Sequence, residues 1–183
     1  MTTITFRTFD HLGAWEQREL VGEIYRDAYA AQIATGDPFN TVDAFMERFR
    51  LYTGRPGLTL VIGYENNEPV GQTWGWPLTA TSGWWSGLTE SQPGFADEDG
   101  TRTFALSEIM VRQAWTGRGI AHALHDELLR DRQEQRATLL VRPENTTAYS
   151  AYKKWGWTKA AELRPGWPSA PLMDVLVLGL PLT

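Results

Sequence analysis

Two glycines lie where an apolar stretch is followed by a helical pattern. A loop of this kind could bind a ligand. Gly117 and Gly119 lie between the apolar run 104–111 and the periodic segment 119–134. Glycine lets backbone approach a ligand without a Cβ in the way, and the first turn of a helix carries unpaired N–H groups and a partial positive charge. Such a loop can bind an anion, for example a pyrophosphate. A simple tight turn explains the same residues equally well.

Glu108 is a candidate base because it interrupts the apolar run 104–111. On a strand it alternates with Ile109 and Val111, so its side chain faces the opposite side from theirs. A carboxylate among apolar residues is costly unless it is paired or hydrated. It could take a proton from an amine or attract an ammonium group, or it could pair with an arginine such as Arg142.

Tyr152 lies in the predicted helical segment 146–155. It shares an apolar stripe with Ala148, Ala151 and Trp155. A phenol can donate a hydrogen bond or a proton to a leaving group. A tyrosine that only packs in the core would occupy the same stripe, so the pattern leaves both interpretations open.

Nine tryptophans is a high number for 183 residues, and several lie outside any clear core pattern. Exposed aromatic clusters often mark ligand surfaces, although most tryptophans are core or pocket-wall residues. An indole suits a flat or apolar ligand, or a cation held over its ring. The tryptophans on predicted strand ends or loops are Trp74, Trp76, Trp84, Trp85 and Trp167, and we expect Trp76, Trp84, Trp85 and Trp167 to bind the substrate.

Composition excludes several classes of protein. The absence of cysteine excludes disulfides, thiolate metal sites and a cysteine nucleophile. Of the three histidines, His122 and His125 are three apart on a predicted helix, but no carboxylate motif accompanies them. We interpret both as solvated and expect no metal. The net charge of −5 argues against a nucleic-acid partner, whereas a mildly acidic surface attracts cationic substrates such as amines.

The chain shows no membrane or export signal. No apolar run approaches the roughly 20 residues that span a bilayer, and residues 1–13 lack the basic start and apolar stretch of a signal peptide. We therefore expect a soluble, cytoplasmic protein without a membrane partner. A length of 183 residues suits one domain, residues 1–183.

Hydrophobic periodicity predicts an α/β (mixed α+β) fold, in which a mixed sheet is flanked by about four helices. The predicted strands are 4–9, 58–64, 70–76, 104–111, 137–141, 158–163 and 173–180, and the predicted helices are 15–34, a helix that Thr41 caps, 119–134 and 146–155. Residues 77–102 are rich in Gly, Ser, Thr, Pro and acidic groups. They predict a long loop or insertion, and loops of this length are usually functional or mobile.

Two motifs resemble those of the GNAT N-acetyltransferases. The first motif of that family is a strand ending in valine, a loop of the form Gln/Arg-x-x-Gly-x-Gly/Ala, and a helix. Val111, Gly119 and Ala121 match it, whereas Thr116 stands where the family has Gln or Arg.

In the second motif an Asn follows the fifth strand, and a Tyr precedes a Gly-aromatic pair. Asn145, Tyr152 and Gly156-Trp157 match this motif in order. The element order also resembles the GNAT fold over nearly the whole chain, least so at 77–102.

The resemblance implies acetyl-CoA as co-substrate and a mostly antiparallel sheet whose parallel strands 104–111 and 138–142 splay apart. The pantetheine would lie along strand 104–111 and the pyrophosphate on loop 117–121, where Arg118 or backbone amides could compensate for Thr116. The cofactor-binding residues so implied are Ile109, Met110, Val111, Thr116, Gly117, Arg118, Gly119, Ile120, Ala121 and Asn145.

The resemblance also implies the order of chemical events. A primary amine of a small molecule would attack the thioester directly, with no covalent enzyme intermediate. A backbone N–H near Val111 would donate to the oxyanion, and Tyr152 would protonate the leaving thiolate.

Alternatives remain at this point. Because Thr116 departs from the motif, one alternative hypothesis is a GNAT-fold transferase that uses another acyl donor, such as an aminoacyl-tRNA. The acidic net charge argues against this alternative. A non-catalytic module that binds CoA or a ligand is the contrasting class. The sequence does not reveal the acceptor, which could be an antibiotic, a polyamine, an amino acid or a protein N-terminus. It leaves a homodimer open.

Overall fold

The computed structural model describes residues 3–182, which form two compact units. The first unit comprises the chain up to Trp76 together with Glu108–Arg130, and the second comprises Pro77–Ser107 together with the chain from Asp131 onward. Strand β4 (Thr103–Val111) contributes its first five residues to the second unit and its last four to the first. The assignment of residues 1–183 to one domain stays a prediction.

The first unit contains most of the helices. Its remaining elements are, in chain order, β1 (Ile4–Phe9), α1 (His11–Glu16), α2 (Arg18–Ala28), α3 (Ala30–Ala34), the 3₁₀ turn η1 (Pro38–Asn40), α4 (Val42–Thr53), β2 (Thr59–Glu65), β3 (Glu68–Pro77), the 3₁₀ turn η2 (Gln113–Trp115) and α5 (Ile120–Leu129). The second unit adds β5 (Arg136–Val141), α6 (Thr146–Lys154), β6 (Thr158–Leu163) and β7 (Met173–Gly179).

In the first unit, β1, β2 and β3 form an antiparallel meander that β4 extends. The strands predicted at 58–64 and 70–76 form a hairpin, β2–β3, and its turn uses Asn66 and Asn67, both with positive φ. Asn tolerates that conformation better than most residues, which suits a two-residue hairpin turn. Strand β4 follows β3, because the N–H of Arg112 donates to the carbonyl of Val70.

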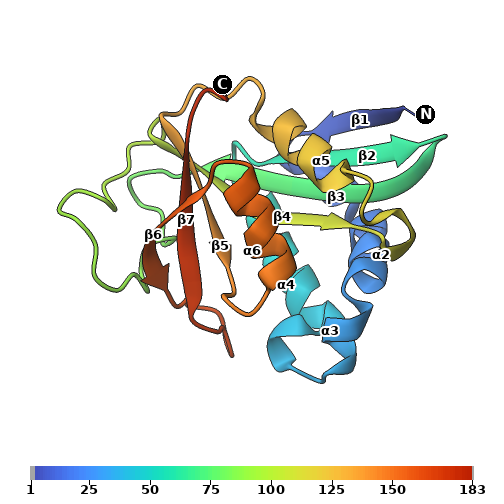
Figure 1. The fold of residues 1–183 in the computed structure, drawn as a ribbon, viewed down its shortest axis with the longest axis horizontal. Helices are drawn as coiled ribbons and strands as arrows, with labels where there is room; N and C mark the ends of the chain where they lie inside the picture. The colour runs from blue at the N-terminus through green and yellow to red at the C-terminus, as the bar shows by residue number, and fades with distance from the viewer. Residues whose placement is uncertain (1–2, 183) are drawn as a thin grey trace. The chain divides into compact units, whose positions relative to one another are not determined.

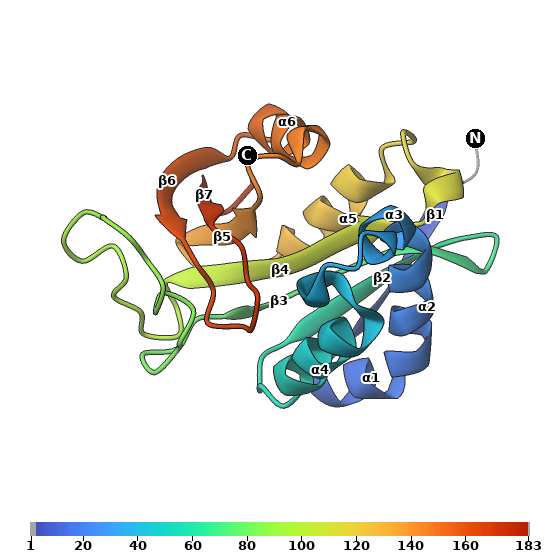
Figure 2. The ribbon, with the colours of Figure 1, turned by 90° about the horizontal axis from the view of Figure 1, so that it is seen from below.

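Helices cover both faces of this sheet (Figure 2): α1, α2 and α4 lie on one face and α5 on the other. On the first face Trp74 is fully buried and packs against Phe45 and Phe49, at centroid distances of 5.8 and 5.0 Å. On the second face Gly71 allows α5 to approach. A Cβ there would lie 2.7 Å from the carbonyl oxygen of Met110 and 3.0 Å from Leu124.

The prediction of one helix over 15–34 is wrong, because the chain forms three short helices there, α1, α2 and α3. The first begins earlier, at His11, because the carboxylate of Asp10 accepts the N–H of Gly13 as an N-cap. Gln17 and Tyr29 then leave helical geometry. Helix α3 has no buried residue, so no packing keeps it continuous with α2.

The second unit has the strand order β4-β5-β7-β6. Thr103–Ala105 of β4 pairs in parallel with Arg136–Thr138 of β5, whereas β5–β7 and β7–β6 are antiparallel. Helix α6 lies against β5 and β7 (Figure 1). The predicted mixed, mostly antiparallel fold is therefore confirmed, with six α-helices among residues 3–182 instead of about four. The splaying of β4 from β5 stays a prediction.

Residues 77–102 form a loop that two arginines fix in place within the second unit. Arg102 donates to the carbonyls of Gly94 and Asp97. Arg136 donates to the carbonyl of Phe95 and pairs with the buried carboxylate of Glu98 at 3.2 Å. The loop is thus tied to the start of the β4–β5 pair.

Helix lengths also differ from the expectation at the end of α5. The predicted helix 119–134 ends at Leu129. Leu128 and Leu129 are its last buried side chains, so the residues after them have no packing to hold a further turn. None of the helices within residues 3–182 has both the length and the apolar character that crossing a bilayer requires.

Candidate functional site

The glycine loop connects β4 to α5 in the first unit. Gly117 and Gly119 have φ values of 76° and 77°, and Gly119 is the N-cap of α5 without any side-chain cap. A Cβ on either glycine would meet no protein atom within 4 Å. Glycine is therefore needed for its left-handed conformation, and the space beside the loop is open. The amides of the first turn of α5 lie where an anion can reach them.

The loop is held by polar side chains that lie far away in the sequence. The carboxylate of Asp27 accepts the backbone N–H of Gln113 at 2.8 Å, and the backbone carbonyl of Asp27 accepts a hydrogen bond from the side-chain amide of Gln113. Glu65 accepts the indole N–H of Trp115 at 3.0 Å and pairs with Arg118 at 3.2 Å. Arg118 remains half exposed, so the loop keeps a cationic side chain near its glycines.

Thr116, which departs from the family motif, has a structural task in this loop. Its hydroxyl donates to the carbonyl of Gln113 at 2.9 Å. The side chain therefore closes the turn that precedes Gly117. This bond accounts for a small hydroxyl residue at a position where the family has a longer side chain.

Glu108 lies on the face of β4 that α2 and α4 cover. Met110, two residues along and so on the same face, contacts Gln72, whose amide also donates to the carbonyl of Val21 on α2. The predicted alternation with Ile109 and Val111 agrees with this placement. Glu108 is half-buried, and burial raises its pKa from 4.5 to about 7, with the charge of Arg48 acting in the opposite direction. The arginine that acts on Glu108 in the first unit is thus Arg48, which the sequence did not suggest.

This raised pKa has a consequence for stability. Because the folded state binds the proton of Glu108 more tightly than the unfolded state, stability falls as pH rises from about 4.5 to about 7. The difference corresponds to roughly 3 kcal/mol at most. We expect Glu108→Gln to raise the melting temperature at pH 8 and to have little effect at pH 5. Glu16→Gln, at an exposed site, should show no such pH dependence, and equal effects of Glu108→Gln at both pH values would contradict the expectation.

Asn145 and Tyr152 lie at the two ends of α6 in the second unit. The Asn145 side chain accepts the N–H of Ala148 at 3.2 Å and so caps the helix. Tyr152 is 8% exposed, and its ring packs edge-on against Trp155 and Trp157. The second motif therefore builds the helix itself, and its role in binding or catalysis stays a prediction.

The predicted acceptor tryptophans are distributed over both units. Trp76 is buried in the first unit and packs against Tyr52 at 4.5 Å. In the second unit Trp85 is buried and donates to Glu98, whereas Trp84 and Trp167 are half-exposed. Trp85 thus helps to hold the loop, and the exposed indole area lies on Trp84 and Trp167.

The interpretation of both helix histidines as solvated is wrong for one of them. His125 is 1% exposed, and its Nδ1 lies 2.8 Å from the carboxylate of Asp126. The same carboxylate lies 3.5 Å from Nε2 of the half-exposed His122. A carboxylate therefore does accompany the pair, and burial lowers the pKa of His125. The sequence held the signal, because Asp126 lies four residues after His122, about one helical turn, so a helix brings the two side chains together.

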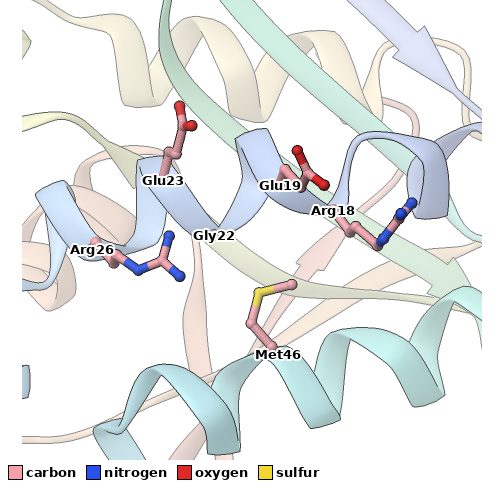
Figure 3. A pocket seen from close by; sticks show the side chains of 6 residues that line it. All are labelled: Arg18, Glu19, Gly22, Glu23, Arg26 and Met46. Carbon is pink, nitrogen blue, oxygen red and sulfur yellow. The ribbon is translucent and has the colours of Figure 1, made fainter.

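A shallow hollow of about 320 Å³ opens between α2 and α4 (Figure 3). Gly22 forms part of its floor, and a Cβ there would lie 3.3 Å from Met46 Sδ, so the glycine allows the two helices to pack closely. Its lining residues are Arg18, Glu19, Gly22, Glu23, Arg26 and Met46. Two positive and two negative side chains give it no preference for a charged ligand.

Comparison with known proteins agrees with this architecture. Residues 18–157 match the Acetyltransferase (GNAT) family, and no curated protein sequence matches the chain significantly. Solved structures with the same fold include a GNAT-family acetyltransferase from Streptococcus agalactiae 2603, with a TM-score of 0.69 and 13% identity over 97% of this chain and 96% of that chain. A second is yncA from Salmonella typhimurium with its cofactor acetyl-CoA, with a TM-score of 0.62 and 17% identity over 98% and 95%.

A third is the paia N-acetyltransferase from Thermoplasma acidophilum in complex with coenzyme A, with a TM-score of 0.61 and 11% identity over 97% of this chain and 99% of that chain. At such identities the similarity concerns the fold alone. The family match carries more weight, because it covers 140 of the 183 residues. The chain therefore belongs to the GNAT acetyltransferase family.

Proposed function

We propose that this protein is an acetyl-CoA-dependent N-acetyltransferase that acetylates a primary amine of a small molecule. The observation that carries the proposal is the loop of Gly117 and Gly119 at the start of α5, whose glycines have positive φ and open space beside them. Membership in the family supports it, as does the presence of acetyl-CoA or CoA in two structures of the same fold.

The loop fits a pyrophosphate because backbone amides and one half-exposed arginine, Arg118, converge at a helix start. In this proposal the amides from Gly117 to Ala121 hold the pyrophosphate, and the backbone of Ile109, Met110 and Val111 binds the pantetheine. Asn145, which caps the start of α6, is also a proposed CoA-binding residue. Acetyl-CoA, when bound, supplies an activated thioester.

Glu108 acts as the base in this proposal. A pKa of about 7 lets a carboxylate accept a proton near neutral pH, which is the match that general base catalysis needs. Glu108 removes a proton from the ammonium group of the acceptor, directly or through water, so that the neutral amine can attack. A backbone N–H near Val111 donates to the developing oxyanion, an interaction that can be worth roughly 3 kcal/mol.

Tyr152 acts as the acid. Its hydroxyl donates a proton to the departing CoA sulfur, and the proton that the attacking nitrogen loses as it becomes an amide restores the phenol. The bond from Thr116 to Gln113 accounts for the departure from the family motif within the loop itself. That departure therefore gives no support to a different acyl donor.

The proposed contacts with the acceptor are the half-exposed Trp84 and Trp167, together with the buried Trp76 and Trp85. We expect Trp84→Ala to raise the KM of the acceptor several-fold more than that of acetyl-CoA, because an indole face is lost from the acceptor side only. The control is Trp15→Ala, which removes an indole that is 38% exposed on α1. Equal changes in both KM values, or none, would count against the assignment.

The test of the proposed function is release of CoA thiol from acetyl-CoA in the presence of an amine panel. The panel contains an aminoglycoside, a polyamine, a set of amino acids and an N-terminal peptide. Thiol release that depends on one class of amine supports the proposal and identifies the acceptor. Tight CoA binding without thiol release with any amine would favour a binding module.

The proposal extends to the chain as a whole. A single family match spans residues 18–157 and so includes parts of both units. We therefore propose that residues 1–183 act as one catalytic domain. An acidic cytoplasmic enzyme with a small cationic acceptor fits the net charge of −5.

A further inference from the structure

Glu108 shares one face of the first unit's sheet with polar groups of the neighbouring strand β3. The antiparallel register of β3 and β4 places Gln72 opposite Met110, since Gln72 Nε2 lies 3.2 Å from Met110 Sδ. The hydroxyl of Thr73 donates to the carbonyl of Glu108 at 2.7 Å, so the next residue, Trp74, lies close to Glu108 across the β3–β4 pair. Trp74 shares a face with Gln72, and Glu108 shares that face with Met110, so the side chains of Trp74 and Glu108 are neighbours on it.

Two buried polar atoms on this face have no hydrogen-bond partner among residues 3–182: Trp74 Nε1 and Gln72 Oε1. Trp74 is fully buried between Phe45 and Phe49, which fix its ring. Gln72 is also fully buried, and its Nε2 donates to the carbonyl of Val21 at 3.0 Å, so its Oε1 must point elsewhere. An unpaired buried N–H is costly and rarely tolerated without a use.

Arg48 brings a positive charge to the same face from α4. Its side chain is only 7% exposed, its Nη1 donates to the carbonyl of Phe39 at 3.0 Å, and its guanidinium stacks over the Phe39 ring at 4.1 Å. These contacts fix the direction of the guanidinium. Its positive charge lowers the pKa of Glu108, in opposition to the effect of burial.

Some other ionisable groups on the covering helices have partners of their own. On α2, the hydroxyl of Tyr25 donates to the carbonyl of Asn40 at 2.8 Å, and Glu23 pairs with Arg112 at 3.9 Å. On α4, the ring of Tyr52 packs against Trp76. The part of β3 on this face, which carries Gln72, Trp74 and Trp76, has no ionisable side chain. Among the charged groups of these elements, Arg48 is the one whose charge lowers the pKa of Glu108, against the larger effect of burial.

We propose that Trp74 and Arg48 are positioning residues for Glu108: the indole N–H of Trp74 holds its carboxylate through one water, and the Arg48 guanidinium stabilises its negative charge. The proposal rests on the proposed function of Glu108 as base and deepens it. Gln72 Oε1 adds an acceptor for the protonated carboxyl. The face thus accommodates both protonation states that a base passes through.

The two substitutions that test this act on the charged form of Glu108. Trp74→Phe keeps a ring against Phe45 and Phe49 but removes the N–H. Arg48→Met removes the charge, and Arg48→Lys keeps it. Because a lost donor or a lost opposite charge disfavours the carboxylate, both Trp74→Phe and Arg48→Met must raise the pKa of Glu108.

The measurement is the titration of Glu108 by ¹³C NMR in protein labelled at the glutamate carboxyl, with Glu108→Gln to assign the signal. We expect a parent midpoint near pH 7. Trp74→Phe should raise it by about half to one pH unit and Arg48→Met by about one, whereas Arg48→Lys should stay near the parent. Phe49→Leu is the matched packing control, since it loses a ring contact with Trp74 but no donor, and its midpoint should not move.

Unchanged midpoints in both Trp74→Phe and Arg48→Met would overturn the proposal. If Trp74→Phe does not fold, Trp74→Met gives the same test with a flexible apolar side chain. The titration needs no acceptor, so it is independent of the proposed function. Shifted midpoints together with full activity of Glu108→Gln would support the positioning and refute the role of Glu108 as base.

Discussion

Tyr152→Phe is expected to lower kcat by about 100-fold, the lower end of the usual effect of a general acid. A thiol is already a fair leaving group, which is why the lower end is expected. Phenylalanine keeps the ring that packs against Trp155 and Trp157. The melting temperature should therefore change little, and the effect should lie in kcat at saturating acceptor.

Tyr149→Phe is the matched control on the same helix. The hydroxyl of Tyr149 donates to Asp174 at 2.8 Å, and Asp174 also pairs with Lys159 at 2.9 Å. Its loss should cost roughly 1 kcal/mol of stability and leave kcat within about twofold. If Tyr152→Phe also retains kcat within about twofold, Tyr152 packs in the core and takes no part in catalysis.

Gly119→Val is expected to weaken CoA binding by at least about tenfold. The added side chain enters the open space beside the loop, where the proposal places the pyrophosphate. Calorimetry with CoA measures the affinity directly and needs no acceptor.

The backbone strain of this substitution requires its own control. Gly119 has a φ of 77°, where valine is strained by roughly 1–3 kcal/mol. Gly36 has a φ of 73° and equally open surroundings. Gly36→Val should thus destabilise the fold by a similar amount without changing CoA affinity. Unchanged affinity in Gly119→Val would refute the assignment of the loop to the pyrophosphate.

The sequence predicted best those features that depend on residues close together in the chain. Gly117 and Gly119 indicate a turn before a helix, and the apolar run of β4 indicates a strand. Both signals come from neighbouring residues, so the sequence alone shows them. The loop's anchors were missed, since Asp27 and Glu65 contact it from positions 86 and 50 residues away in the chain. No local periodicity records such contacts.

Arg48 shows the same limit for electrostatics. Its position in α4 reads as an ordinary helical arginine, and only the packing of α4 over the sheet brings its charge to Glu108. The N-terminal helices show the limit for local structure. The spacing of Leu20, Ile24, Ala28 and Ala31 continues through a point where the chain leaves helical geometry at Tyr29.

The central claim is that an acetyl group passes from acetyl-CoA to an amine by direct attack. The most direct measurement follows carbon-labelled acetyl by mass spectrometry of both the small molecules and the intact protein. The account predicts one N-acetylated amine for each CoA thiol released, and no acetylated protein when acetyl-CoA is supplied without acceptor. An acetylated protein that passes its label to the amine, or CoA binding with no labelled amine in any class tested, would contradict it.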